Sequence, residues 1–172
     1  FYSVSSVFPW QKNMNYASTI ESPIGKITIL AEDDFVYAVT FAEEDINGLA
    51  ENELTKIVAK QLKNYFAGSL KEFNFPIKQK GTEFQQGVWQ NLLFIPYGET
   101  TTYAKFSAHN PLAIRAIAAA NGKNNIAIVI PCHRVIGSNG KLVGYAGGLW
   151  RKQWLLQHER EVAQKGQTEL KF

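Results

Sequence analysis

The stretch IAIVIPCHRV, residues 126–135, decides how the second half of the chain is expected to fold. Its first five residues are apolar and mostly β-branched, which predicts a short buried strand at 126–130. The Gly-Ser-Asn-Gly sequence at 137–140 is typical of a turn, and the residues of 142–145 predict a return strand. We therefore expect a β-hairpin, with Cys132 directly after its first strand.

Short helices are expected upstream of this hairpin. Thr82 can cap a first helix. Its buried face would carry Val88, Trp89, Leu92 and Leu93. A second helix is predicted at 102–108 and a third, opened by Pro111, at 112–120. Two short helices around an Asn-Pro turn, followed by a hairpin, predict a winged helix-turn-helix. The alanines of 112–120 would let that helix approach a groove closely, but a small-residue helix in a core shows the same pattern.

The first half of the chain predicts a small α/β unit. Runs of β-branched and aromatic residues predict strands at 16–22, 25–31, 35–41 and 73–77. Asn47 is a candidate cap for a helix whose apolar residues recur at helical spacing up to Phe66. Gly68 should end that helix.

We expect two domains, because the pattern changes from strands to short helices near residue 81. The first is an α/β domain at 14–80, and the second is a helical domain at 81–160. A last amphipathic helix at 150–158 would turn Trp154, Leu155 and Leu156 inward. Residues 161–172 are expected to form a tail. Residues 1–13, which precede the only methionine, are expected to be a leader or non-native residues.

Composition and charge bound the class of protein. The 172 residues are 45% hydrophobic and include 4 Trp, 7 Tyr and 11 Phe, which excludes a disordered chain. No apolar run approaches the roughly 20 residues of a membrane span, and no signal peptide is visible, which favours a cytoplasmic protein. Residues 81–172 hold ten of the 18 Lys and Arg but five of the 15 Asp and Glu. An anionic partner would therefore dock on this half.

Cys132 is the only cysteine, so the chain has neither an intramolecular disulfide nor a thiolate-rich zinc site. A lone cysteine at a strand end is most often a small buried hydrophobe. Here an adjacent imidazole, His133, and local positive charge favour a nucleophilic thiolate instead. Glu159 is then a candidate to orient His133, and the alternative is an exposed acid at a helix end.

Several motifs accompany the Ile-Pro-Cys-His-Arg-Val-Ile sequence of 130–136. They are Gly-Tyr-Ala-Gly-Gly-Leu at 144–149, Asn-Gly-Lys-Asn-Asn at 121–125, Phe-Gln at 84–85 and Pro-Tyr-Gly-Glu-Thr-Thr-Thr-Tyr at 96–103. Together they closely resemble the active-site signature of the O6-alkylguanine-DNA alkyltransferases. Looser markers at 22–25 and 65–68 resemble the front domain of that family, which implies a ribonuclease H-like fold for the α/β domain.

The resemblance implies suicide repair of DNA, in which an alkyl group moves irreversibly from O6 of a damaged guanine to Cys132, without a metal or other cofactor. It implies that His133 acts as the base through a water and that Glu159 orients it. Asn124 would brace the cysteine loop against the recognition helix, and Tyr103 would donate a hydrogen bond near guanine N3. The pocket would be completed by the Val135 carbonyl, as acceptor for the guanine amino group, and by Tyr145, Ala146 and Gly147.

The same resemblance implies how DNA is bound. Arg115 matches a finger that fills the base stack once the damaged nucleotide has flipped out, and a monomer would bind duplex DNA through the minor groove. Further DNA contacts are implied for Asn110, Ala116, Ala119, Ala120, Asn121, Gly122, Lys123 and Ser138.

Two differences from the family pattern narrow the choice among its constitutive, adaptive-response and animal members. Ala146 stands where some members have a serine whose hydroxyl reaches O6, so only a backbone donor is expected there. The lack of further cysteines excludes the zinc site of some animal members and the sensor domain of the adaptive-response members, which favours the constitutive bacterial type.

Three functions are alternatives to alkyl transfer: a non-catalytic relative that binds alkylated DNA, a winged-helix regulator and a cysteine hydrolase. Cys132 argues against the first, because such relatives replace the nucleophile. The few base-reading groups of 115–120 argue against the second. The absence of a protease-type Cys–His spacing argues against the third.

Overall fold

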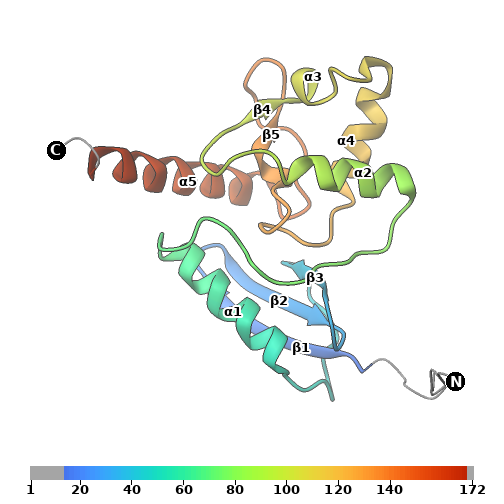
Figure 1. Ribbon diagram of the computed structural model, residues 1–172, viewed down its shortest axis with the longest axis vertical. Coiled ribbons are helices and arrows are strands. Elements are labelled where there is room, and N and C mark those ends of the chain that lie inside the picture. Colours follow the sequence, from blue (N-terminus) through green and yellow to red (C-terminus); the bar gives the residue numbers. More distant parts are fainter. Residues whose placement is uncertain (1–13, 170–172) are drawn as a thin grey trace, which may run out of the picture.

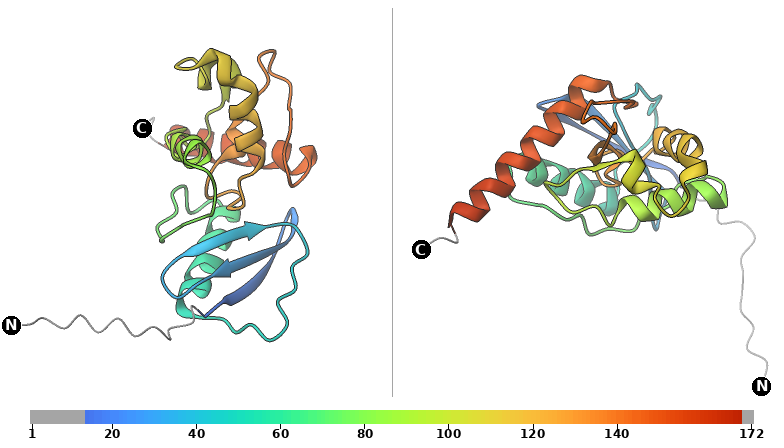
Figure 2. Two further views of the ribbon diagram at one scale, coloured as in Figure 1. Left: turned by 90° about the vertical axis from the view of Figure 1, so that its right-hand side faces the viewer. Right: turned by 90° about the horizontal axis from the view of Figure 1, so that it is seen from above.

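The computed structural model describes residues 14–169 and shows two units stacked on each other (Figures 1 and 2). The lower unit in Figure 1 comes from the first part of the chain and contains a sheet and one helix. The upper unit is largely helical, and a linker runs between the two along one side. An α/β unit followed by a helical unit is the expected arrangement. The predicted leader, residues 1–13, lies outside the described residues.

A three-stranded antiparallel sheet, in the order β1–β2–β3, forms the centre of the first unit. Its strands are β1 (Tyr16–Ser22), β2 (Gly25–Ala31) and β3 (Val36–Thr40), which confirms three of the predicted strands. Successive side chains of β2 point to opposite faces, and both faces are covered. Ile29 joins the main core, whereas Leu30 packs with Ala17 and Ala38 on the other face.

Helix α1 (Glu53–Phe66) packs against this sheet (Figure 2). The side chain of Asn52 accepts a hydrogen bond from the Thr55 backbone N–H, and the Thr55 hydroxyl accepts one from the Asn52 backbone N–H. This reciprocal cap satisfies two N–H groups that the first turn leaves free, so Asn47 is not the cap and that prediction is wrong. Gly68 follows the helix with a φ of +80°, a conformation that favours glycine.

The linker is less regular than expected. The strand predicted at 73–77 is reduced to one parallel bridge, between Ile77 and Val36 of β3. Val36 exchanges backbone hydrogen bonds with Pro76 and Lys78 at 3.0 and 2.9 Å. The prediction of a strand is wrong because Pro76 lacks the N–H that a continuing ladder requires.

Helix α2 (Glu83–Leu92) opens the second unit and begins after Thr82, as predicted. Thr82 and Gln85 form another reciprocal cap. Val88, Trp89 and Leu92 are buried, as expected. Leu93 is 48% exposed, because it lies at the end of the helix, and its predicted burial is wrong.

The next two helices lie near their predicted places. They are α3 (Tyr103–Phe106) and α4 (Ile114–Gly122), with a 3-10 turn at Pro111–Ala113 between them. Proline fixes φ and lacks an N–H, which suits this turn before α4. Ile117 and Ala120 pack against Val88 of α2, so α4 has a core face as well as an exposed one.

Segment 126–130 is buried, but it is not a strand. Ile126 makes one parallel bridge to Val39 of β3, after which the chain turns, with Ile128 at a φ of 72°. The apolar run is buried because it is packed between the two units and not because it is part of a sheet. The strand prediction is therefore wrong here.

The predicted hairpin is also wrong. Strand β5 (Val135–Ile136) pairs in parallel with β4 (Thr101–Thr102), and residues 142–145 form no strand. The loop at 142–145 is held instead by the ammonium of Lys152, which donates to the Val143 carbonyl at 2.8 Å. The two helices of the predicted motif are present, but a wing is not formed in the described part of the chain.

Helix α5 (Leu149–Glu169) is longer than the predicted 150–158, so the expected tail begins inside it. Leu155 is fully buried, while Trp154 and Leu156 are partly buried. Within residues 14–169, no helix combines the length and the apolar character that crossing a bilayer requires.

One hydrophobic core joins the two units. Ile29 and Tyr65 of the first unit belong to the same buried cluster as Leu92, Ile126 and Leu155 of the second. The loop that leads to Cys132 lies in this cluster. Both units therefore fix the position of the cysteine.

Candidate active site

Cys132 begins a short 3-10 turn, Cys132–Arg134, directly after the buried loop. The thiol is free and the residue is 6% exposed. It lies in the wall of a cavity of about 370 Å³. Phe41 from the first unit and Asn121, Tyr145 and Arg151 from the second line the same cavity, so the site lies where the two units meet.

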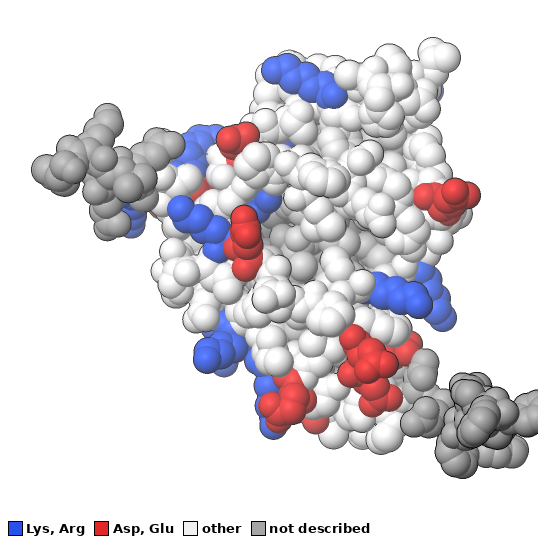
Figure 3. Space-filling model, viewed as in Figure 1, with Lys and Arg blue, Asp and Glu red and all other residues white. Residues whose placement is uncertain are grey.

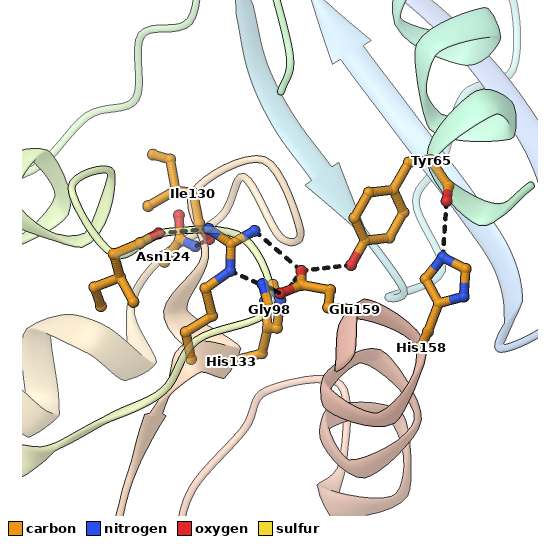
Figure 4. A network of polar contacts seen from close by, with 9 residues as sticks. Tyr65, Gly98, Asn124, Ile130, His133, His158 and Glu159 are labelled. Atoms are coloured by element: carbon orange, nitrogen blue, oxygen red, sulfur yellow. Dashed lines mark hydrogen bonds and ion pairs between the residues drawn. The ribbon is translucent and has the colours of Figure 1, made fainter. Parts of the chain in front are cut away.

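The side chain of Asn124 organises the cysteine loop. Its Nδ2 donates to the Ile130 carbonyl at 3.0 Å (Figure 4). The same Nδ2 lies 3.4 Å from Cys132 Sγ. Its Oδ1 accepts from the Ile126 N–H at 3.0 Å and from Gln79 Nε2 at 2.9 Å. These bonds run within the loop and to the linker. The predicted brace against α4 is therefore wrong for this side chain.

His133 and Glu159 form a buried pair, with His133 Nε2 2.7 Å from Glu159 Oε1. The carboxylate also accepts two hydrogen bonds from Arg134, at 2.9 and 3.0 Å, and one from the Tyr65 hydroxyl at 2.7 Å. The Gly98 N–H is a further donor, at 3.2 Å (Figure 4). Glu159 is fully buried in the middle of α5, so an exposed acid at a helix end is excluded.

The charges of this network favour a neutral base beside an ionised acid. Burial raises the pKa of Glu159, but His133 and Arg134 together outweigh it and hold the pKa far below the usual range. Burial, helped by the charges of Arg134 and Lys152, lowers the pKa of His133 although Glu159 acts to raise it. Because Nε2 faces the carboxylate, Nδ1 is the basic nitrogen, and it has no hydrogen-bond partner. This nitrogen is free to receive a proton.

Tyr103 and Asn121 form a second polar pair beside the cysteine. Asn121 Nδ2 donates to the Tyr103 hydroxyl at 2.7 Å and lies 3.4 Å from the Cys132 carbonyl. The Tyr103 O–H proton remains available for a ligand. Asn121 was expected to touch DNA, but it is only 4% exposed, so it positions Tyr103 and that prediction is wrong.

Lys152 is a buried cation close to the thiol. Its ammonium donates to the carbonyls of Val135, at 2.6 Å, and Val143, at 2.8 Å. Burial lowers the pKa of Lys152 to about 8, and Cys132 partly opposes this. Burial also raises the pKa of the Cys132 thiol, while the Asn124 N–H and the Lys152 charge lower it.

The predicted pocket residues differ in their positions. Tyr145, Ala146 and Gly147 line the cavity, but Val135 is fully buried and does not. A Cβ on Gly147 would lie 2.8 Å from the Phe41 ring, so this close approach between the units requires glycine.

Arg151 links the Gly147 side of the cavity to the first unit through hydrogen bonds. It donates to the carbonyls of Ile24 and Gly147, both at 2.7 Å. Its guanidinium also lies 4.7 Å from the centre of the Phe41 ring.

The residues predicted to contact DNA lie mostly at the surface of α4 and its flanks. Arg115 is exposed on α4. The others that are exposed are Asn110, Ala116, Ala119, Gly122, Lys123 and Ser138. Ala120 is 2% exposed and its carbonyl accepts the Trp89 indole N–H, so its predicted contact is wrong. In Figure 3, acidic side chains gather on the lower unit, and a broad area of the upper unit has no charged side chain.

Four site residues were missed from the sequence: Tyr65, Gln79, Arg151 and Lys152. Tyr65 belongs to a motif that was read only as a domain marker. The other three belong to no motif: Gln79 binds Asn124 45 residues away, and Arg151 and Lys152 bind backbone carbonyls, which leave no mark in a sequence. Lys152 and Arg134 are two of the ten basic residues in 81–172, the half expected to face an anionic partner, but both are buried and hydrogen-bonded internally.

Comparison with known proteins covers nearly all of the described chain. Residues 15–79 match the ribonuclease-like domain of 6-O-methylguanine DNA methyltransferase, and residues 83–161 match its DNA binding domain. A methylated-DNA–protein-cysteine methyltransferase of Methanosarcina acetivorans is 45% identical, covering 84% of this chain and 97% of the relative. The constitutive enzyme of that name from Bacillus subtilis is 42% identical, covering 86% of this chain and 96% of the relative.

Comparison with solved structures points to the same family. The O6-methylguanine methyltransferase of Mycobacterium tuberculosis has a TM-score of 0.77 and 41% identity, covering 86% of this chain and 94% of that one. A structure of the OGT protein of the same organism in complex with DNA has a TM-score of 0.78 and 42% identity, with the same coverage. Fold and site thus define a two-domain 6-O-methylguanine DNA methyltransferase. The chain belongs to the family of methylated-DNA–protein-cysteine methyltransferases.

Proposed function

We propose that Cys132 accepts the alkyl group directly from O6 of guanine in DNA, so that the protein repairs the damage by reversal and works once per chain. The observation that carries this proposal is the position of the only cysteine, which lies in the cavity wall 3.4 Å from the Asn124 amide N–H. The adjoining His133 is held by Glu159 with one ring nitrogen free.

The first step is activation of the thiol. The thiol proton moves to Nδ1 of His133, through a water as the family resemblance implies, and the positive charge that forms is stabilised by Glu159. The Asn124 N–H and the Lys152 ammonium stabilise the thiolate. Both groups favour the thiolate form of Cys132, which burial alone would disfavour.

The second step is transfer of the alkyl group. The Cys132 thiolate attacks the alkyl carbon, the carbon–O6 bond breaks as the carbon–sulfur bond forms, and the electron pair goes to the guanine. Tyr103 donates a hydrogen bond near guanine N3 and so stabilises the developing charge. The proton held by His133 neutralises the departing guanine, which balances the reaction. The thioether has no route back to a thiol.

Access to Cys132 requires that the damaged base leave the duplex. The sulfur lies in a cavity between the units, which a base inside the stack cannot reach. We infer that α3 and α4 bind double-stranded DNA as a helix-turn-helix, with the exposed face of α4 in the minor groove. Arg115 then fills the gap left by the flipped nucleotide. The protein acts as a monomer in the cytoplasm, where a reduced thiol persists beside DNA.

Mass spectrometry of the protein after incubation with duplex DNA containing O6-methylguanine tests the proposal. We expect one methyl group on Cys132, and none on a Cys132→Ser variant that still binds DNA. Binding of damaged DNA without any change in mass would instead indicate the non-catalytic alternative.

A further inference from the structure

The linker between the two units reaches the active site through the side chain of Gln79. This residue is 5% exposed, and its amide makes two hydrogen bonds. Nε2 donates to Asn124 Oδ1 at 2.9 Å, and Oε1 accepts from the Asn125 backbone N–H at 2.8 Å. The Gln79 carbonyl accepts from Gln86 Nε2 of α2 at 2.6 Å. Gln79 is thereby fixed by α2 on one side and by the cysteine loop on the other.

Gln79 binds the oxygen end of the Asn124 side-chain amide. This bond influences which atom of that amide faces the Cys132 sulfur. The two ends of an asparagine amide have nearly the same shape but opposite hydrogen-bonding character. With two donors directed at Oδ1, from Gln79 and from the Ile126 N–H, the Nδ2 end faces Cys132 Sγ. In the reversed orientation an oxygen would face the sulfur, and it would repel a thiolate.

We propose that Gln79 is a positioning residue for the transfer reaction, because it keeps the Asn124 N–H directed at Cys132 Sγ. The inference deepens the proposed function and rests on it, since it takes Cys132 as the acceptor. A hydrogen bond donated to the sulfur favours the thiolate, so the linker contributes to the reactivity of the nucleophile.

The backbone of the cysteine loop has a separate anchor. Val39 of β3 donates to the Asn125 carbonyl and accepts from the Ala127 N–H, both at 2.9 Å. A substitution at Gln79 is therefore expected to remove one of the two donors to Asn124 Oδ1, leaving the Ile126 N–H, while the loop keeps its path. Besides His133, the proposed base for the thiol proton, the ionisable groups that act on the thiol or are acted on by it are Lys152, Tyr103 and Tyr145. Substitution of Gln79 leaves all three in place.

The test measures how fast iodoacetamide alkylates the protein at pH 6 to 10. Because the chain has one cysteine, carbamidomethylation of the peptide that contains Cys132 reports this thiol alone. Gln79→Leu removes both side-chain bonds. Gln79→Glu keeps the acceptor for Asn125 and presents a carboxylate to Asn124 Oδ1. The matched control is Gln61→Leu, because Gln61 of α1 also makes two hydrogen bonds to the linker, both with Asn74, at 3.1 and 2.9 Å.

We expect Gln79→Leu to raise the apparent pKa of the thiol by about 0.5–1 unit, which slows alkylation below that pKa by about 3- to 10-fold. Gln79→Glu should raise it further, and Gln61→Leu should leave it unchanged. DNA affinity should be unchanged in all three. If Gln79→Leu does not fold, the comparison of Gln79→Glu and Gln79→Met with the control decides the question.

Thiol pKa values equal to that of the wild type in the Gln79 variants would overturn the proposal, even if these variants melt at a lower temperature. A wild-type protein that takes no methyl group from DNA would overturn the proposed function instead. The alkylation profile would still decide whether Gln79 positions Asn124, so the two failures are distinguishable.

Discussion

His133 Nε2 lies 2.7 Å from Glu159 Oε1, although the two residues are 26 positions apart and both are buried. The same carboxylate accepts from Arg134 and from Tyr65 of the first unit. Glu159 therefore has two tasks. It orients the base next to the nucleophile, and it joins α5 to the N-terminal unit.

Replacing Glu159 by Gln should slow methyl transfer and also destabilise the protein. Removing one partner of a buried ion pair costs about 3 kcal/mol, because it leaves Arg134 without its counter-charge. For a protein of this size the melting temperature should fall by about 6–12 °C. Calorimetry and single-turnover kinetics check both effects. The control is Glu161→Gln, an exposed position on the same helix, and a Glu159 variant that behaves like this control would contradict the assignment.

Acidification should destabilise the fold below about pH 6.5. The pKa of His133 is lowered from its ordinary value of 6.5, so the unfolded chain takes up this proton first and stability falls as the pH drops. The lowered pKa of Glu159 acts in the same direction: its contribution is complete above the ordinary value of 4.5 and is lost as the pH falls further. Urea unfolding between pH 7.5 and pH 4 measures this. Stability that is flat or rises on acidification would show that the pair is not buried as described.

Substituting Arg115 by Ala should impair repair of duplex DNA far more than reaction with free O6-benzylguanine. The exposed guanidinium is proposed to act on base flipping, and a free base has no stack to leave. Loss of one cationic contact should also reduce the salt dependence of DNA binding by about one unit of slope. Arg160→Ala, at an exposed position of α5, serves as control. Equal losses on both substrates would assign Arg115 to the pocket.

Alkylation of Cys132 should destabilise the protein. The added group must fit where Asn124 Nδ2 lies 3.4 Å from the sulfur, and it ends the donation to a thiolate. Overfilling a packed site costs about 1–3 kcal/mol, and a protein of this size loses about 2–4 °C of melting temperature per kcal/mol. A benzyl group should lower the melting temperature more than a methyl group. Alkylated and free protein that melt at the same temperature would contradict a closely packed thiol.

The sequence predicted strands and helices well where their own residues determine them. The alternation in β1 and β2 and the cap at Thr82 are local signals, and the structure confirms them. The apolar run at 126–130 was misread because a loop packed between two units shows the same continuous hydrophobicity as a buried strand. The predicted end of helix α5 at 158 is too early, because the polar residues that follow on its exposed side carry no signal that would mark where the helix ends.

The site was predictable as far as its motifs extend. Cys132, His133 and Asn124 lie in such motifs, and the structure brings Cys132 and Asn124 into contact. Gln79 could not be found because its partner Asn124 is 45 residues away, and Lys152 could not be found because its partners are backbone carbonyls, which every residue has. Asn121 was expected at the DNA surface only because of the family resemblance, whereas the structure buries it against Tyr103 and the Cys132 carbonyl.

The number of methyl groups that one chain accepts tests the central claim most directly. The protein is incubated with a tenfold excess of duplex DNA containing O6-methylguanine, and both the repaired guanine and the intact protein mass are followed. We expect repair to stop at one lesion per chain, with every chain carrying one methyl group on Cys132. Continued turnover, a methyl group on any other residue, or repair by Cys132→Ser would contradict the account.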